Sequence, residues 1–564
     1  MDNSMNRDSF IANIEESLKN HWDYPALSDY KAEPKYYSVI AKQIARAHIF
    51  FEECGIKKED KIALCGRNSA NWAISFFSII TYGAVAVPIL HEFKPEAVHH
   101  LVNHSEAKLL FVGDVVWEGL DHKKMEGLNA IILIPDFSMV YSSCNSCKRA
   151  FQRIEERFHK KYPRGFRRDN VKYDRENIDD LAIINYTSGT TSLSKGVMLS
   201  YRAINSNLLF AKEVLPDMTA GMNIISMLPM AHMYGMSFEI IFEFMIGMHI
   251  HFLTRVPSPK IIAEAFESVK PDLIIAVPLI IEKIYKSKIK PMIDKTLVKI
   301  LLNTPIIDSV IKNKILSSLN NAFGGRFYEI IIGGAALNQE VETFFKKLGL
   351  RYTIGYGMTE CAPIITYADW KIHKLNSCGK VTPRMEIRID SPDSENIVGE
   401  ILVKGDNVMM GYYKNPEATA AVFTEDGWLK TGDLGLIDKE GNLFIKGRSK
   451  NMILGASGQN IYPEEIEDKL NSMEYVMESI VLEQEGKIIA MVYLNQDMLD
   501  QEGIDIVHSK SIIKEIKEQV NKELPAYSQI SYIYLQEEEF EKTPKRSIKR
   551  YLYTSTIQHK KPIE

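Results

Sequence analysis

Short apolar runs alternate along the chain with longer stretches of helical periodicity. The runs are rich in β-branched and aliphatic residues, as in KIALCG, AKLLFVG, AIILIP and DLIIAVP. Between such runs, YSVIAKQIARAHIFFEECG repeats its apolar positions at the spacing of an amphipathic helix. Strands that alternate with helices are typical of parallel sheets joined by crossover helices. The chain is therefore predicted to be an α/β protein with largely parallel sheets.

Two apolar stretches, residues 72–90 and 224–250, approach the length of a membrane span. Proline and polar residues interrupt both of them, namely Pro88 in the first and Pro229, His232, Glu239 and Glu243 in the second. Buried strands and helices of a large core are therefore favoured over membrane-spanning segments. Peripheral contact with a membrane surface stays open, and we expect no dedicated anchor for it.

The pattern of residue types along the chain changes in two places. Residues 151–180 are highly charged and predict an exposed helix and loop. After Thr431 the strands become shorter, and GLIDKEGNLFIKGRSKNMIL predicts a hairpin that turns around residues 440–442. A domain boundary is expected at residues 449–451, with a compact α+β unit after it.

Length and charge narrow the range of functions. A chain of 564 residues exceeds one hydrophobic core, so at least two domains are expected. The net charge of −5 and the isoelectric point near 6.3 provide no broad basic field, which argues against a nucleic-acid partner. The six cysteines do not form a disulfide framework and the first residues lack a signal-peptide pattern. A reducing, cytoplasmic location is therefore expected.

Two groups of residues resemble metal ligands. Cys144 and Cys147 form one CxxC motif with no second pair nearby in the sequence, which disfavours a structural zinc site. His99, His100 and His104 place an i,i+4 histidine pair on a predicted helix, but no third ligand is evident. Solvated or packed histidines are favoured over a metal site.

The segment YTSGTTSLSKG, residues 186–196, combines the features of a phosphate-binding loop. Gly189 and Gly196 allow close backbone approach to an anion, and Lys195 adds a positive charge. Donors to an anion are supplied by Thr187, Ser188, Thr190 and Thr191. The segment lacks the glycine before the lysine and the Ser or Thr after it that define a Walker A loop. A Ser/Thr-rich surface turn is the alternative.

Four further motifs follow in the chain: YGMTE at 356–360, TGD at 431–433, GRSKNMI at 447–453 and KTPKRSIKR at 542–550. Their order and spacing resemble the core motifs of the adenylate-forming (AMP-binding) superfamily, which includes acyl-CoA synthetases, luciferase-like enzymes and adenylation domains of peptide synthetases. LPMAHMYG, AVPLIIEKIY and GGAALNQEVETFF are most similar to bacterial long-chain fatty acid–CoA ligases.

This resemblance implies a large N-terminal domain, residues 1–449, of mixed, mostly parallel sheets with helices. A small mobile C-terminal α+β lid, residues 450–564, is expected to follow it. Lys450 matches the hinge residue of the family.

The resemblance also implies roles for individual residues. Glu360 and Thr187 are expected to bind Mg²⁺, and Thr359 to lie near the α-phosphate. Tyr356 is expected to stack on adenine, and Asp433 to accept from the ribose hydroxyls with Arg448 as an added donor. The remaining nucleotide-binding positions are Gly333, Gly334, Ala335, Gly355, Gly357 and Met358.

His232 matches a position beside the acyl and thiol channels of the family, so a substrate gate is one hypothesis and a hydrogen-bonded core histidine is the other. The nearby methionines either line an acyl tunnel or, as the favoured alternative, pack in the core; they are Met227, Met230, Met233, Met236, Met245 and Met248.

Two departures from the family pattern stand out. Ser192 and Ser194 occupy positions where Gly and Pro are usual, and Ser547 occupies the slot of the adenylation lysine. In an extended segment Lys545 and Lys549 would emerge on the same face as Ser547, so either could substitute, with Lys549 preferred. Solvated tail charges are the alternative.

The implied function is that of an ATP-dependent acyl-CoA synthetase, with ATP, Mg²⁺ and coenzyme A, acting on a medium-to-long fatty acid through an acyl-adenylate. The expected catalytic residues are Glu360, Thr187, Lys195, Lys549 and Ser547. The alternatives are transfer to an acyl carrier protein, activation of an aryl acid, and an acyl-nucleotide sensor of low turnover.

Overall fold

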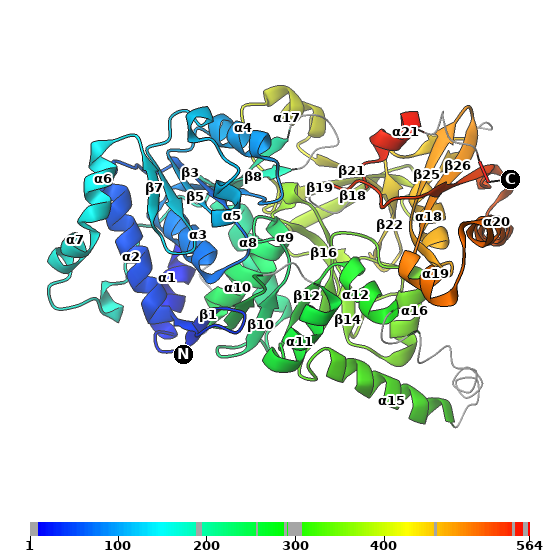
Figure 1. Ribbon diagram of the computed structural model, residues 1–564, viewed down its shortest axis with the longest axis horizontal. Coiled ribbons are helices and arrows are strands. Elements are labelled where there is room, and N and C mark those ends of the chain that lie inside the picture. Colours follow the sequence, from blue (N-terminus) through cyan, green and yellow to red (C-terminus); the bar gives the residue numbers. More distant parts are fainter. Residues whose placement is uncertain are drawn as a thin grey trace.

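The computed structural model describes residues 9–187, 194–254, 258–286, 290, 307–455, 459–543, 548–556 and 562–563. Sheets covered by helices make up one end of the molecule, and a smaller α+β unit lies at the other end (Figure 1). This arrangement confirms the predicted fold class.

The largest sheet has eight strands in the order β20-β9-β8-β4-β3-β5-β6-β7. Its central strands are parallel, whereas β9, β20 and β7 pair antiparallel with their neighbours. The strands are β3 (Lys61–Cys65), β4 (Val85–Ile89), β5 (Leu109–Val112), β6 (Ala130–Leu133), β7 (Met139–Ser142), β8 (Leu181–Thr187), β9 (Lys195–Ser200) and β20 (Gly411–Tyr412).

Both faces of this sheet are buried. Ile62 and Leu64 of β3 join the core formed with α2 (Tyr37–Glu53) and α3 (Ala70–Tyr82). Ala63 faces the other way and packs with residues of α4 (Pro95–Ser105). Burial on both faces explains why the strands are continuous apolar runs rather than alternating ones.

Two further sheets complete the α/β part. One has the order β10-β11-β1-β2 and the other, entirely parallel, has the order β12-β13-β14. The strands are β1 (Pro25–Asp29), β2 (Lys35–Tyr36), β10 (Asn223–Ser226), β11 (His249–Phe252), β12 (Ile274–Ala276), β13 (Ile330–Ile332) and β14 (Tyr352–Ile354). The helices around them are α1 (Phe10–Asn20), α8 (Tyr201–Val214), α9 (Met233–Met236), η3 (Ser237–Ile241), α10 (Phe242–Ile246), α11 (Pro259–Val269), α12 (Pro278–Ile284), α15 (Ile307–Ala322) and α16 (Gln339–Leu348).

The next part of the chain forms two antiparallel sheets. One contains β15 (Tyr356–Gly357), β16 (Ile364–Tyr367) and β17 (Lys380–Val381), and the other contains β18 (Met385–Asp390), β19 (Gly399–Gly405), β21 (Leu429–Ile437) and β22 (Leu443–Arg448). Ile437 pairs with Leu443 across a turn in which Gly441 has φ +85°. The predicted hairpin around residues 440–442 is thereby confirmed.

The C-terminal unit has its own apolar core. Its main sheet is β25 (Val476–Gln484), β26 (Lys487–Leu494) and β27 (Tyr532–Gln536), and it packs with α18 (Pro463–Asn471) and α20 (Ile506–Glu523). The smaller elements are β23 (Ile453–Leu454), β24 (Asn460–Ile461), α19 (Gln496–Glu502), η7 (Arg550–Leu552) and α21 (Tyr553–Thr556).

The two long apolar stretches belong to the core, as predicted. Residues 72–90 form most of α3 and all of β4, and residues 224–250 run from β10 into β11. Over the described ranges, no helix is both long and apolar enough to cross a bilayer. The charged segment 151–180 contains α7 (Ile154–Lys161) and a largely exposed loop, although Phe158, Phe166 and Val171 are buried.

Candidate functional site

The predicted phosphate loop connects β8 to β9 at the end of an antiparallel hairpin. Thr187, the last residue of β8, pairs with Lys195, the first residue of β9. Ser188, Gly189, Thr190, Thr191 and Ser192 lie outside the described residues. The hairpin places Thr187 and Lys195 side by side at the two ends of the loop.

Gly196 has a packing role that the sequence did not indicate. A Cβ at this position would lie 2.9 Å from Cγ2 of Ile184 and 3.1 Å from Cε1 of Tyr186. The expected role in close approach to an anion is therefore not needed to explain this glycine, because its cross-strand neighbours already fill the space.

Glu360 is linked to the phosphate loop through Tyr412. The phenol of Tyr412 donates to Oε1 of Glu360 at 3.0 Å, and Nζ of Lys195 lies 4.6 Å from the centre of the Tyr412 ring. Burial and, next, the charge of Glu360 raise the pKa of the Tyr412 phenol. Tyr412 therefore stays protonated at neutral pH and acts as a donor to the carboxylate.

The backbone around Glu360 is held by close packing. Glu360 lies in the 3-10 turn η5 (Thr359–Cys361), just after β15, and its carbonyl accepts from the amide of Met409 at 2.8 Å. A Cβ on Gly357 would lie 2.2 Å from the carbonyl oxygen of Pro363, so only glycine fits there. Thr359 is buried, and Met358 is half-buried.

Asp433, Tyr356 and Arg448 form a second cluster. The Tyr356 phenol donates to Oδ2 of Asp433 at 2.6 Å, and Nε of Arg448 donates to Oδ1 at 2.8 Å. Asp433 and Arg448 are cross-strand neighbours in β21 and β22. The Asp433 side chain is 8% exposed, whereas that of Arg448 is 56% exposed.

Burial sets the ionisation properties of this cluster. It raises the pKa of Asp433, although the nearby Arg448 charge and the Tyr356 hydrogen bond act in the opposite direction. Burial, then the charge of Asp433, also raises the pKa of the Tyr356 phenol. Each oxygen of Asp433 has a second lone pair, so the carboxylate can still accept from ligand hydroxyls.

The glycine-rich segments lie at the carboxyl ends of parallel strands. Gly333 follows β13 and donates its amide to the carbonyl of Ala276 at 3.1 Å, and Gly355 follows β14 and donates to Ile332 at 2.9 Å. Gly334 has φ +88°. In open α/β sheets, ligands bind outside the carboxyl ends of the strands, which is where Gly333, Gly334, Ala335 and Gly355 are found.

His232 is half-buried at the start of α9, and its carbonyl accepts from the amide of Met236 at 2.8 Å. Two residues later, Tyr234 donates to the carbonyl of Ile331 at 3.0 Å and its ring would lie 3.0 Å from a Cβ on Gly333. This stretch therefore lies against the glycine-rich segment. The six methionines around it are buried in the core, which supports the packing alternative.

The C-terminal motif is anchored at both ends within its own unit. Lys542 pairs with Glu478 at 2.6 Å, and Arg550 pairs with the buried Glu467. Lys549 directs its ammonium to Oε2 of Glu541 at 3.2 Å. Lys545 and Ser547 lie outside the described residues. Lys450 is exposed in the turn between β22 and β23, where Asn451 donates its amide to the carbonyl of Arg448 at 3.0 Å.

The sequence missed the two tyrosines that connect the site. Tyr412 reaches Glu360 because edge strand β20 pairs with β9, and Tyr234 reaches Gly333 through packing of α9 on β13. The available sign of a site residue in the sequence was the pair Tyr412-Tyr413 after Gly411. A tyrosine ring can pack in an apolar environment while its hydroxyl reaches a polar partner.

The family model for AMP-binding enzymes matches residues 14–413. The chain belongs to the AMP-binding enzyme family. A second model, the AMP-binding enzyme C-terminal domain, matches residues 450–560 of this AMP-binding enzyme and begins at Lys450.

Named relatives agree with the family assignment. The chain is 28% identical over 465 residues to long-chain-fatty-acid–CoA ligase FadD15 of Mycobacterium bovis, covering 78% of this chain and 74% of that protein. It is 27% identical over 597 residues to long-chain-fatty-acid–CoA ligase 5 of Rattus norvegicus, covering 95% and 84%. The anthranilate CoA ligase AuaEII, solved with anthranoyl-AMP, is 18% identical with a TM-score of 0.76 over 97% of both chains, and this likeness shows the fold.

Proposed function

We propose that this AMP-binding enzyme is an ATP-dependent acyl-CoA ligase that activates a medium-to-long fatty acid. The observation that carries the proposal is the placement of two polar clusters around the short segment that follows the parallel strand β14. Asp433 with Tyr356 and Arg448 forms one cluster, and Glu360 with Tyr412 and Lys195 forms the other. Tyr356 and Glu360 belong to one short segment, so the two clusters are adjacent.

The first cluster suits a nucleoside. A buried carboxylate accepts two adjacent hydroxyls of a ribose through its two oxygens. Arg448 holds one oxygen from an exposed position, so a ligand can share or replace its contact at little cost. The ring of Tyr356 and the backbone of the glycine-rich segments after β13 and β14 are the groups proposed to contact the base.

The second cluster suits phosphates. Lys195 and Thr187, at the two ends of the loop, supply a charge and a hydroxyl. Glu360 engages one oxygen with Tyr412, and no described residue donates to the other, Oε2. One carboxylate plus substrate phosphates is a usual setting for Mg²⁺, which would offset phosphate charge when held by Glu360 and Thr187.

The reaction follows from the poor reactivity of a carboxylate. A carboxylate oxygen attacks the α-phosphorus of ATP, the bond to pyrophosphate breaks, and an acyl-adenylate forms. The sulfur of coenzyme A then attacks the acyl carbon and AMP leaves, while the thiol proton passes to solvent. Lys195 and the loop donors hold the charge that develops on pyrophosphate, so their contribution is electrostatic positioning.

The choice of a fatty acid rests on the relatives, which are named as long-chain-fatty-acid–CoA ligases. We also propose that residues 1–449 carry the nucleotide and acyl pockets and that residues 450–564 form a lid that turns about Lys450. His232, beside the segment that packs on Gly333, is proposed as a gate to the acyl pocket.

ATP–pyrophosphate exchange with a panel of acids tests the proposal. Exchange that depends on palmitate or decanoate, followed by thioester formation with coenzyme A, is the expected result. Exchange with anthranilate or benzoate alone would favour an aryl-acid ligase. Thioester formation with an acyl carrier protein but not with coenzyme A would show that the carrier protein is the acyl acceptor. Binding of ATP without exchange with any acid would favour a sensor.

A further inference from the structure

Three of the six cysteines lie together where α2 meets α6 (Asn145–Gln152). Cys54 is the residue after α2, Cys144 is the N-cap of α6, and Cys147 lies in the first turn of that helix. Cys54 and Cys147 are buried, whereas Cys144 is partly exposed. The CxxC motif of the sequence is thus joined by a third thiol from a helix about ninety positions away.

Cys144 occupies a position that stabilises a thiolate. Its Sγ accepts from the amide of Cys147 at 3.4 Å, lies 3.3 Å from Oγ of Ser146, and is 2.6 Å from Sγ of Cys147. The positive end of the α6 dipole faces the same sulfur. Partial burial raises the pKa of the Cys144 thiol, but hydrogen bonds from Cys147, Ser146 and Ser142 outweigh it and lower the pKa overall.

The thiols of Cys147 and Cys54 have raised rather than lowered pKa values. Burial raises the pKa of Cys147, and its side-chain hydrogen bond with Cys144 raises it further. Burial raises the pKa of Cys54 as well, and its contact with Cys147 adds to the effect. The cluster therefore contains one accessible, easily ionised sulfur and a buried protonated thiol in direct contact with it.

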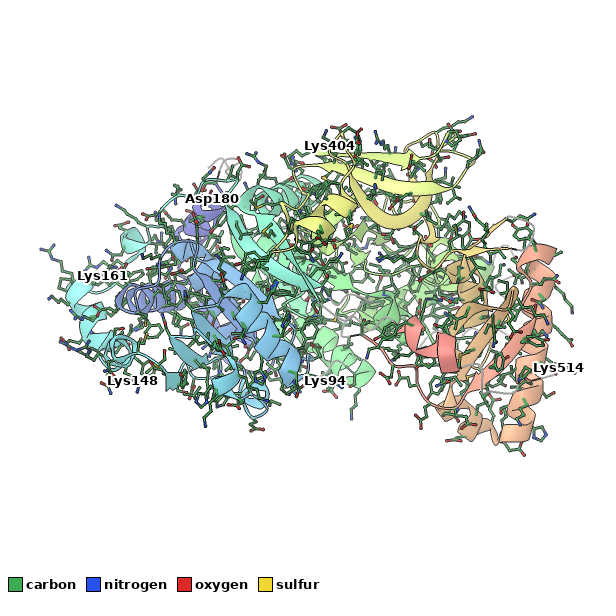
Figure 2. The ribbon with its side chains drawn as sticks, turned by 90° about the horizontal axis from the view of Figure 1, so that it is seen from above. Lys94, Lys148, Lys161, Asp180, Lys404 and Lys514 are labelled. Atoms are coloured by element: carbon green, nitrogen blue, oxygen red, sulfur yellow. The ribbon has the colours of Figure 1, made fainter. Side chains whose placement is uncertain are left out.

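We propose that Cys144 and Cys147 form a reversible dithiol–disulfide pair that exchanges with low-molecular-weight disulfides, with Cys144 as the attacking sulfur. Figure 2 labels Lys148, the next residue after the pair, at the end of the molecule opposite to Lys514 of the C-terminal unit. The pair is thus remote from the lid and forms a separate chemical site.

The exchange balances as follows. The Cys144 thiolate attacks one sulfur of the external disulfide, forms a mixed disulfide and releases one thiolate. Cys147 loses its proton and attacks the Cys144 sulfur, which expels the second thiolate. The protein dithiol loses two electrons and two protons, and the external disulfide is reduced to two thiols.

A metal site is less consistent with the cluster. Metal binding requires thiolates, and burial favours the protonated form of both Cys54 and Cys147. Within the part of the chain that the structure describes, no group of three or more His, Cys, Asp or Glu residues is arranged to hold a metal ion.

Equilibration of the full-length protein with mixtures of reduced and oxidised glutathione tests the proposal. After acid quenching and alkylation under denaturing conditions, mass spectrometry should show that the number of free thiols falls from six to four. The peptide that contains Cys144 and Cys147 should carry a disulfide, which dithiothreitol should reduce again. In the Cys147→Ser variant, Cys144 should instead carry glutathione as a stable mixed disulfide.

Matched variants separate the alternatives. Cys65→Ser, which removes a buried thiol on β3, should leave disulfide formation unchanged. Cys144→Ser should abolish it. The proposal is overturned if Cys144 and Cys147 both remain alkylatable in oxidised glutathione, if the bridge found is Cys54–Cys147, or if the purified protein holds a metal ion that a chelator removes with release of three thiols.

Discussion

Asp433 and Glu239 are both buried acidic side chains, but different groups surround the two carboxylates. Asp433 is buried with two donors, Tyr356 and the exposed Arg448, whereas Glu239 is buried with donors from Ser226, Met227 and Leu228 and lies inside the core. Glu239 satisfies backbone amides and is structural. Asp433 retains a second lone pair on each oxygen, which the proposed ribose contacts would use.

Asp433→Asn should weaken ATP binding with little loss of stability. The amide removes a charge-assisted interaction of about 1.5–3 kcal/mol, so the KM for ATP should rise roughly ten- to hundredfold. Because the pKa of Asp433 is raised in the folded state, its charged form at neutral pH lowers stability, and the neutral amide removes that cost. Pyrophosphate exchange and thermal unfolding measure the two effects. A large fall in the melting temperature with unchanged KM would contradict the proposed role.

Glu360→Ala should abolish acid-dependent exchange while the protein stays folded, because the proposed metal contact is lost. Tyr412→Phe removes only the hydrogen bond to Glu360 and should cost about 1.5 kcal/mol, roughly tenfold in exchange rate. Tyr413→Phe is the matched control, since its phenol binds the exposed Glu106. Wild-type exchange by Glu360→Ala in saturating Mg²⁺ would show that the assignment is wrong.

Among the secondary-structure elements, paired strands bring residues from different sequence motifs close together. The β8–β9 hairpin aligns Thr187 with Lys195, and β20 adds Tyr412 to the same edge. In the C-terminal motif, an antiparallel bridge joins Lys542 to Ile548, and ion pairs to Glu478 and Glu467 fix the two ends. These contacts anchor the described residues at the two ends of the motif.

Lys549→Ala should slow adenylate formation strongly, Lys545→Ala should slow it less, and Ser547→Lys should speed it. A serine hydroxyl cannot supply the charge of the usual lysine, and loss of one such donor costs about 10²–10³-fold. For Lys549 to act, it must leave Glu541, which a solvent-exposed pair allows at little cost. Lys487→Ala, on the surface of β26, is the control.

Single-turnover adenylate formation measures these rates. If neither alanine change slows the step and Ser547→Lys does not speed it, both lysines are solvated charges and the substitution hypothesis fails.

For the whole molecule, polar contacts join the C-terminal unit to the larger part. Asn338 of the large part donates to Oγ of Ser472 at 2.8 Å, and Nζ of Lys286 donates to the carbonyl of Val476 at 3.4 Å. Domain interfaces of this polar kind permit relative motion. Lys450, the proposed hinge, lies in an exposed turn between β22 and β23.

Lys450→Pro should spare adenylate formation and suppress thioester formation, because a fixed φ restricts rotation at the proposed hinge. Within the described residues, the backbone amide of Lys450 donates no hydrogen bond to another backbone group, so proline at this position removes none. Lys450→Ala leaves φ free and should behave as wild type. Separate assays of exchange and of thioester release distinguish the steps, and equal loss of both would argue against two lid orientations.

Features that depend only on residues close together in the chain were predictable from the sequence. Apolar runs predicted the buried strands, and the turn at residues 440–442 predicted a hairpin. The motifs were sufficient for the family, because their order along the chain is a property of the sequence.

Contacts between side chains far apart in the chain became known from the folded structure. Tyr412 contacts Glu360 across fifty-two positions and Tyr356 contacts Asp433 across seventy-seven. Cys54 joins Cys147 because α2 and α6 pack at the edge of the large sheet. Such contacts depend on the order of strands in a sheet and on helix packing, which local periodicity does not specify, because many arrangements bury the same apolar residues equally well.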